Sequence, residues 1–179
     1  KVSSQVRVLI AEDEYLTCQV VRRTVEQTGA VVVGEAANGL QAVAMTRELR
    51  PDVVLMDLNM PDMDGIQAAQ SLQETCPTPV VVLTACESPE ILQRVSASGV
   101  GAYLVKPPNA REIDRAITIA RARFGDLLKL KARQKELETA LARVKILSGL
   151  LPICVGCKRI RNDRGYWDRV EHYLQEHTQ

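Results

Sequence analysis

The sequence is poor in aromatic residues and has no long apolar run. Aromatic side chains make up 3% of the 179 residues, so a core must be packed from valine, leucine, isoleucine and alanine. No apolar stretch approaches the roughly 18 residues that span a membrane, and residues 1–8 lack the apolar centre of a secretory signal. We therefore expect no membrane association and a cytoplasmic location.

A large charge of one sign is also missing, because the formal net charge is +1. The charge is nevertheless uneven: residues 1–124 hold 12 basic and 15 acidic side chains, whereas residues 125–179 hold 11 and 7. A basic C-terminal part can contact nucleic acid or an acidic partner, and a solvated helix face explains the same charge equally well. No helix-turn-helix pattern follows Gly149, and too few residues remain for a catalytic output domain.

Cysteine is sparse and odd in number, with five residues in the chain. Cys18, Cys76 and Cys86 are scattered, and we expect them to be small core or surface residues. Cys154 and Cys157 alone form a recognisable C-x-x-C pattern.

Five short apolar runs alternate with amphipathic segments along the first two thirds of the chain. Runs rich in valine, leucine and isoleucine are typical of strands that are covered on both faces. The alternation predicts a doubly wound α/β domain, (βα)5, with a parallel five-stranded sheet. The expected strands are 6–11, 31–35, 53–57, 80–84 and 101–105, and the helical stripes between them lie at 16–25, 42–49, 66–72 and 91–95.

Polar side chains stand at the ends of four of these strands. The first strand runs into Glu12 and Asp13, the third ends on Asp57, the fourth on Thr84, and the fifth leads into Lys106. The carboxyl ends of parallel strands line one crevice, where such folds bind ligands. Each residue alone has an ordinary structural explanation, but together they predict a site for a hard cation and a phosphoryl group.

The chemistry of such a site follows from its acids. Clustered carboxylates repel each other, so we expect either a divalent cation or a raised pKa on one acid. Mg²⁺ prefers oxygen ligands in octahedral geometry and keeps several waters. We expect Asp13, Asp57 and the backbone carbonyl of Asn59 to bind Mg²⁺ directly, and Glu12 to act through water or as a second acid.

The same chemistry assigns roles for phosphoryl transfer. Asp57 would attack phosphorus and become an aspartyl phosphate. Lys106 would pair with one phosphoryl oxygen as a point charge, and Thr84 would donate a hydrogen bond to another.

The residues next to these strand ends carry a family resemblance. Asp57 is followed by Leu-Asn-Met-Pro and then Asp64-Gly65, Thr84 by Ala85, and Lys106 by Pro107. With Glu12, Asp13 and Tyr103, this combination resembles the receiver domain of two-component response regulators, a flavodoxin-like fold, over residues 5–124.

The resemblance implies several further properties. The phosphoryl donor would be a phosphohistidine on a sensor histidine kinase or phosphotransfer protein. The Lys106–Pro107 peptide bond would be cis. Tyr103 would swing inward when Thr84 moves toward the phosphate, which reshapes the surface of the fourth helix, fifth strand and fifth helix; a half-exposed strand residue is the alternative for Tyr103.

A receiver domain is a phosphoacceptor switch and not a turnover enzyme. The alternative with the same chemistry is a Mg²⁺-dependent phosphatase with an aspartate nucleophile. Such phosphatases carry a second aspartate two residues after the first, and this chain has Asn59 there. A nucleic-acid-binding regulator that acts through the basic C-terminal part is the other alternative.

The fifth helix is expected to begin near Asn109 and to continue to about Gly149, with Gly125 as its one interior breaker. From Leu127 the apolar positions step by three and four residues, as in a coiled coil. The seam consists of Leu127, Leu130, Gln134, Leu137, Leu141, Val144, Ser148 and Leu151.

In a parallel pair of these helices, charges of opposite sign would face each other. Asp126 would meet Lys131, and Arg133 would meet Glu138, of the second chain. We therefore expect a parallel homodimer through residues 126–151. The alternative is a single amphipathic helix packed on its own domain.

Residues 150–179 differ in character and contain the C-x-x-C pair and a Gly-Tyr-Trp triplet at 165–167. They resemble a short module that follows receiver and sensor domains in bacterial signalling proteins and that has a second C-x-x-C further downstream, so the chain is expected to be truncated or to lack that part. The expected division is a receiver domain at 5–124, a coiled-coil helix at 125–149 and this module at 150–179.

The spacing Cys154-x2-Cys157-x14-His172-x4-His177 falls within the range of zinc sites. Two readings without zinc remain: unmetalled thiols beside ordinary helix histidines, and a redox-active dithiol. The latter usually stands in a βαβ context, which is absent from this part of the sequence.

Overall fold

The computed structural model describes residues 5–85, 100–150, 154–161 and 167–172, with only the backbone for 142–150 and 161. The chain divides into two compact units, Lys1–Leu128 and Lys129–Gln179. The fourth helix expected around residues 91–95, Cys86 and His177 lie outside the described residues. No described helix is long and apolar enough to cross a bilayer.

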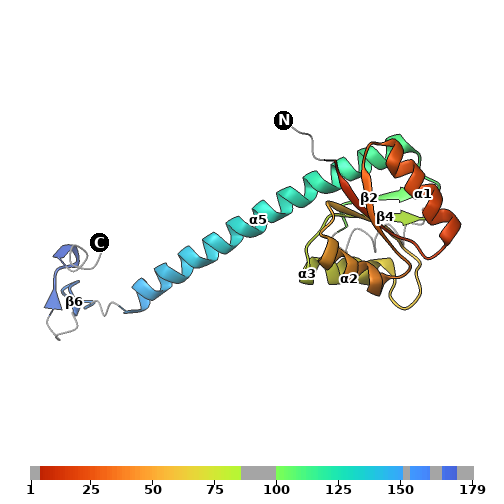
Figure 1. Ribbon diagram of the computed structural model, residues 1–179. Helices are drawn as coiled ribbons and strands as arrows, with labels where there is room; N and C mark the ends of the chain where they lie inside the picture. The colour runs from red at the N-terminus through yellow and green to blue at the C-terminus, as the bar shows by residue number, and fades with distance from the viewer. Residues whose placement is uncertain (1–4, 86–99, 151–153, 162–166, 173–179) are drawn as a thin grey trace. The chain divides into compact units, whose positions relative to one another are not determined.

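The first unit is built on a five-stranded sheet in the order β2-β1-β3-β4-β5, and all its neighbouring strands are parallel (Figure 1). This strand order is that of flavodoxin-like proteins, so the predicted fold is confirmed. The strands are β1 Arg7–Ala11, β2 Val31–Ala36, β3 Val53–Asp57, β4 Val80–Thr84 and β5 Ala102–Val105.

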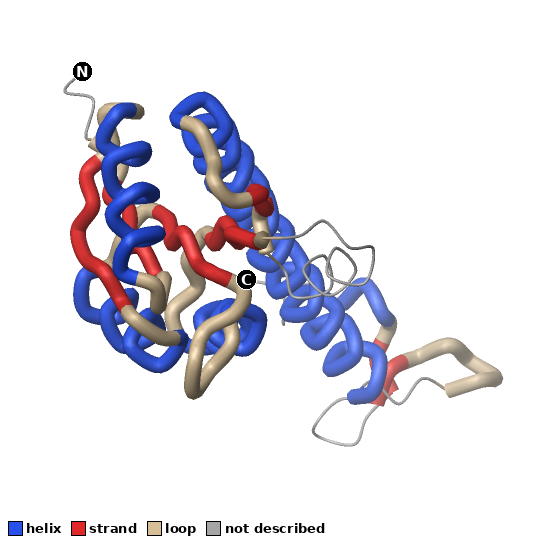
Figure 2. The backbone as a smooth tube through the Cα atoms, turned by 90° about the vertical axis from the view of Figure 1, so that its right-hand side faces the viewer, coloured by secondary structure: helices blue, strands red, loops and turns tan. Residues whose placement is uncertain are grey.

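Helices cover both faces of the sheet, as Figure 2 shows with the strands in red between the blue helices. The side chains of β1 alternate between the two cores: Val8 and Ile10 pack with α1 and α5, whereas Leu9 and Ala11 pack with α2 and α3. Every residue of β3 and β4 is buried, which accounts for their continuous apolar sequence. The helices are α1 Tyr15–Gln27, α2 Gly39–Leu49, α3 Gly65–Thr75 and α5 Ala110–Leu150.

Side-chain caps define where the helices begin. Asp64 and Gln67 form a reciprocal capping box at the start of α3. At the start of α5, the backbone N–H of Glu112 donates to Asn109 Oδ1 at 3.0 Å, and that of Asn109 donates to Glu112 Oε2 at 2.9 Å. The expected start near Asn109 is confirmed. Each such cap stabilises its helix by about 1 kcal/mol.

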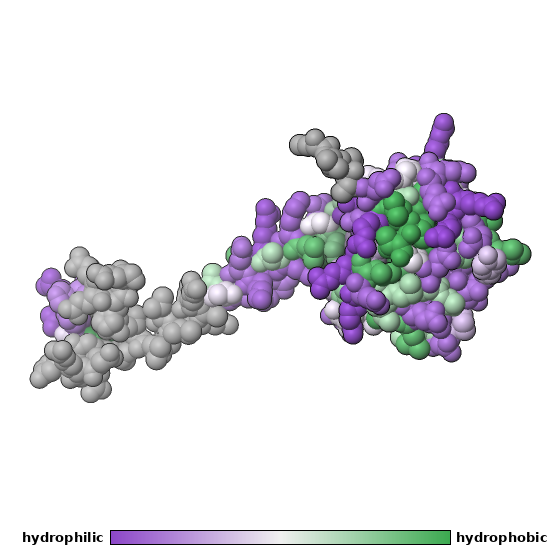
Figure 3. Space-filling model, in the orientation of Figure 1, coloured by the Kyte–Doolittle hydropathy of each residue, from purple (hydrophilic) through white to green (hydrophobic). Residues whose placement is uncertain are grey.

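Helix α5 continues without a break to Leu150. Its side chains from Leu128 to Leu141 are all exposed, and Leu130, Leu137 and Leu141 are each at least 60% exposed. In Figure 3, apolar (green) atoms lie among hydrophilic (purple) ones along this stretch.

The described part of the second unit beyond α5 contains a small hairpin. Strands β6 Ile160–Arg161 and β7 Trp167–Asp168 pair antiparallel, and Ile160 is fully buried. The backbone of Asp168 pairs with Ile160 in the hairpin, so the helical residues begin only at Val170.

The fold makes a prediction about two glycines with opposite surroundings. A Cβ added at Gly65 would lie 2.1 Å from the backbone oxygen of Asp57, whereas one at Gly125 meets nothing within 4 Å. Gly65→Ala should lower the free energy of unfolding by about 3 kcal/mol through overpacking. Gly125→Ala should raise it by about 1 kcal/mol, because alanine is the better helix former.

Urea denaturation of the two variants beside the parent chain measures both effects. Equal stabilities for parent and Gly65→Ala would show that α3 does not approach β3 this closely.

Candidate functional site

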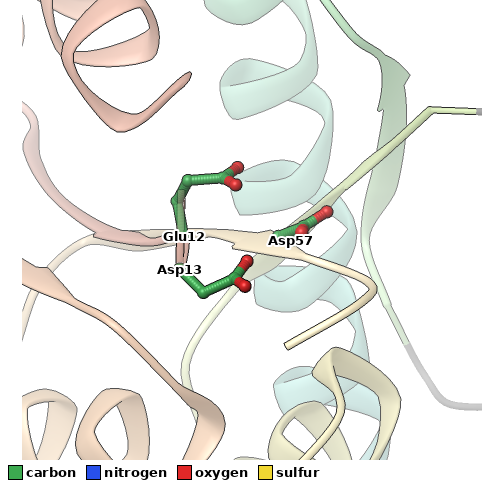
Figure 4. Close-up of side chains that lie close together, drawn as sticks. All are labelled: Glu12, Asp13 and Asp57. Carbon is green, nitrogen blue, oxygen red and sulfur yellow. The ribbon is translucent and has the colours of Figure 1, made fainter. Parts of the chain in front are cut away.

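Three carboxylates meet at the carboxyl ends of β1 and β3, where the strand order of the sheet reverses direction. Glu12 and Asp13 directly follow β1, and Asp57 is the last residue of its neighbour β3. One ligand oxygen from each lies within 4.8 Å of the other two, and Figure 4 shows the three side chains close together. Glu12 and Asp57 are buried, while Asp13 is exposed and gives the cluster access to solvent. The sheet thus brings together the acids that the sequence predicted.

Lys106 adds a positive charge from the end of β5. Its Nζ lies 2.5 Å from Glu12 Oε2 and 2.9 Å from Asp57 Oδ1, so it bridges both buried acids. Its backbone N–H donates to the carbonyl of Thr84 at 2.8 Å, which ties it to the end of β4. The Lys106–Pro107 peptide bond is cis, as the resemblance implied.

Burial and mutual repulsion set the protonation of this cluster. Burial raises the pKa of Glu12, and the nearby Asp57 adds to this, while the hydrogen bond from Lys106 opposes it without cancelling it. Burial lowers the pKa of Lys106, but its hydrogen bonds to Asp57 and Glu12 outweigh that effect, so the pKa is raised. The pKa of Glu12 is thus shifted in the direction that burial beside a second carboxylate predicts.

The loop after β3 is held close to the strand by Gly65. Its backbone N–H donates to the carbonyl of Leu58 at 2.9 Å, and any side chain at Gly65 would collide with the backbone of Asp57. The glycine was noted in the sequence only as part of a motif. The close approach of α3 to β3 is the physical reason for a glycine at this position. A glycine at the first position of a helix is the sequence signal that could have indicated it.

The other predicted site residues lie near this cluster in the sheet. Thr84 is buried at the end of β4, and the neighbouring strand β3 ends there with Asp57. Tyr103 lies on β5 and is 41% exposed. Asn59 is exposed, two residues after Asp57. The ion pair between Glu12 and Lys106 was not predicted. The two opposite charges follow strands of one sheet, and this was the sequence signal that could have indicated the pair.

The structure does not gather the described members of the predicted zinc set. Among the described residues, the acids at the strand ends are the one group of three or more potential metal ligands. His172 instead faces Asp168, with Nδ1 at 3.3 Å from Oδ2. Cys154 and Cys157 are free thiols, and hydrogen bonds from the backbone N–H of Cys157 lower the pKa of Cys154, with its side chain and the N–H of Gly156 adding to the effect.

Comparison with known proteins agrees with this geometry. Residues 8–118 match the family model of the response regulator receiver domain. The match covers more than half of the chain, so the chain belongs to this family of two-component signalling proteins.

The chain is 37% identical to the transcriptional regulatory protein PdtaR of Mycobacterium tuberculosis over 141 residues, which covers 79% of this chain and 69% of PdtaR. It is 35% identical to a protein-glutamate methylesterase/protein-glutamine glutaminase of Carboxydothermus hydrogenoformans, but spans only 40% of that protein. Among solved structures, the signal receiver domain of NarL from Mycobacterium tuberculosis has a TM-score of 0.62 and 32% identity, covering 66% of this chain and 97% of that domain.

The bridging lysine generates a stability prediction. Lys106→Met leaves the two buried carboxylates without their counter-charge and should lower the free energy of unfolding by about 3 kcal/mol. Adding Glu12→Gln should recover part of this loss, because it removes one of the uncompensated charges.

Urea denaturation at pH 7 with a chelator present measures these values. Lys135→Met, on the exposed part of α5, is the matched control and should change stability by less than about 0.5 kcal/mol. A Lys106→Met variant as stable as the control would contradict the bridging role.

Proposed function

We propose that this chain is a phosphoacceptor switch in which Asp57 takes a phosphoryl group from a sensor histidine kinase or a phosphotransfer protein. The observation that carries the proposal is the position of Asp57, which is buried beside two further acids and lies 2.9 Å from the ammonium group of Lys106. A carboxylate placed among acids and one lysine, at the switch point of a doubly wound sheet, suits a reversible covalent phosphate.

The donor set suits Mg²⁺. The three carboxylates are hard oxygen ligands within 4.8 Å of one another, and the exposed Asp13 leaves one side open to water. Asp13, Asp57 and the backbone carbonyl of Asn59 are the proposed direct ligands, with Glu12 acting through water. When bound, the cation would offset the repulsion between the acids and an incoming phosphoryl group.

The side chains then carry out the phosphoryl transfer. A carboxylate oxygen of Asp57 forms a bond to phosphorus while the phosphorus–nitrogen bond of phosphohistidine breaks, and the imidazole nitrogen leaves with the electron pair. Lys106, already in contact with Asp57, pairs with a phosphoryl oxygen. The hydroxyl of Thr84, at the end of the neighbouring strand, donates a hydrogen bond to another.

The proposed activity is a switch and not catalytic turnover. A phosphatase with an aspartate nucleophile needs a second acid two residues further on, where this chain has the amide side chain of Asn59. An amide can neither protonate a leaving group nor activate water as a carboxylate does. The similarity to a protein named as a transcriptional regulator supports the same conclusion.

Phosphorylation would act on the rest of the chain through β5 and α5. Tyr103 on β5 is 41% exposed, so its side chain is not held in the core, and we propose that it moves inward when Thr84 turns toward the phosphate. Helix α5 begins five residues after β5 and continues to Leu150, so a change in this surface reaches the coiled-coil stretch through one helix.

We propose that this change acts on a parallel homodimer formed through residues 126–151. The exposed leucines 130, 137 and 141 share one seam with a heptad spacing, and the flanking charges would pair with opposite signs between two chains. A long helix with exposed leucines gains most of its stability from such a partner.

Phosphorylation is tested by incubating the chain with acetyl phosphate and Mg²⁺ and measuring the intact mass. The parent chain should gain one phosphate, and Asp57→Asn should gain none, because the amide is not a nucleophile toward phosphorus. Removing Mg²⁺ with a chelator should abolish the gain in the parent chain.

Asp62→Asn is the matched control, since it removes one exposed acid of the neighbouring loop and asparagine tolerates the positive φ of 65° found there. The control should be phosphorylated like the parent. A phosphate gain by Asp57→Asn equal to that of the parent would sink the proposal.

The dimer is tested by sedimentation equilibrium. Leu137→Ser removes a seam leucine from both chains, at a cost of about 2 kcal/mol per side chain, and should weaken association more than 100-fold. Leu128→Ser, which removes an exposed leucine outside the seam, is the matched control and should associate like the parent. A monomeric parent chain, or equal effects of the two variants, would show that this seam does not pair.

A further inference from the structure

The C-x-x-C segment forms a closed turn that the proposed switch does not use. The backbone N–H of Cys154 donates to the carbonyl of Arg159 at 2.9 Å, and that of Lys158 donates back to the carbonyl of Cys154 at 2.8 Å. Lys158 has a φ of 51°, in the left-handed region that few lysines occupy. The turn is therefore a defined structure in which a non-glycine residue adopts a costly conformation.

Both cysteines lie within this one hydrogen-bonded turn. A Cβ placed at Gly156 would lie 4.0 Å from the sulfur of Cys154, so the turn folds back toward that sulfur. Cys154 is partly buried, Cys157 is exposed, and both are free thiols. The turn therefore presents a pair of soft sulfur ligands from one short segment.

The hairpin that follows the turn has too little apolar core to hold itself together. Its strands β6 and β7 have two residues each, and Ile160 is the one fully buried side chain among residues 154–160 and 167–172, whose side chains the structure describes. An isolated two-stranded hairpin is marginal in water, and small modules of this kind commonly depend on a disulfide or a structural metal.

We propose that Cys154 and Cys157 bind a soft divalent cation, Zn²⁺, as the thiolate pair of a structural metal site that stabilises the turn and hairpin. Soft thiolates are preferred ligands of Zn²⁺, and in structural sites its binding energy contributes directly to folding. The site is separate from the acids at the strand ends, whose hard oxygen ligands suit Mg²⁺, and it does not depend on the proposed phosphorylation.

The geometry favours a metal over a redox-active dithiol. Reactive C-x-x-C pairs place the first cysteine at a helix N-terminus, which lowers its pKa. Here residues 154–161 form a turn and a strand, so Cys154 does not begin a helix. Among the described residues, no group of three potential metal ligands contains His172 together with the two thiols.

Cobalt titration of the reduced full-length chain tests the proposal, with Co²⁺ as the probe and Zn²⁺ as the competitor. Thiolate ligation produces a sulfur-to-cobalt charge-transfer band in the near ultraviolet, which the oxygen ligands of Glu12, Asp13 and Asp57 cannot produce. The band should appear in the parent chain and disappear when Zn²⁺ is added.

Cys154→Ser and Cys157→Ser should each weaken metal binding at least about 100-fold. Loss of a residue that only supports a ligand already costs up to about 100-fold, and these substitutions remove a ligand itself. Cys76→Ser, which removes a partly buried thiol of the first unit, is the matched control and should bind like the parent. Absence of the band in the parent, or its persistence after both substitutions together, overturns the proposal.

Hydrogen exchange supplies a second readout that does not depend on cobalt. Amides of residues 154–161, 167 and 168 should exchange slowly with Zn²⁺ and at least tenfold faster after chelation, and this difference should vanish in the double serine variant. Equal exchange with and without Zn²⁺ overturns the structural role. Asp57→Asn should keep the cobalt band, and Cys154→Ser should keep phosphorylation, so failure of one proposal is distinguishable from failure of the other.

Discussion

The receiver part of this chain depends on the balance of charge among three acids and one lysine. Glu12 and Asp57 are buried side by side, and their repulsion is offset by a single ammonium group that contacts both, at 2.5 and 2.9 Å. This balance is local and incomplete, because burial still raises the pKa of Glu12. A site that holds excess negative charge with one side open, at Asp13, is ready for a cation and responds to any group that changes its charge.

The fold keeps these groups together by backbone constraints rather than by side-chain packing alone. The parallel order of β1 and β3 places their ends next to each other, and the hydrogen bond between Lys106 and Thr84 fixes the end of β5. Gly65 lets α3 begin almost in contact with the backbone of Asp57. The charged groups therefore occupy set positions on a rigid sheet, which is the arrangement that a precise site requires.

Helix α5 contrasts with this site because part of its apolar surface is exposed in the single chain. Its first part packs against the sheet with Ile113 and Ala120 fully buried, whereas its continuation carries exposed leucines in a heptad pattern. The same helix thus belongs to the core of the receiver part and supplies a surface suited to a second copy. The thiol-bearing turn that follows is equally poor in core, so the proposed partner chain and the proposed ion would each stabilise one of these C-terminal features.

The amino-acid sequence by itself determined the fold class and predicted the three acids that the sheet brings together. Continuous valine-rich runs specify buried parallel strands, and polar residues directly after them must gather at one edge of the sheet. Only the tertiary structure decided that Lys106 bridges Glu12 and Asp57, that Gly65 touches the backbone of Asp57, and that Asp168 joins a hairpin. The contacts of Lys106 join residues distant along the chain, and the other two join residues on either side of a loop. All of them depend on strand order or loop path, which local sequence patterns do not encode.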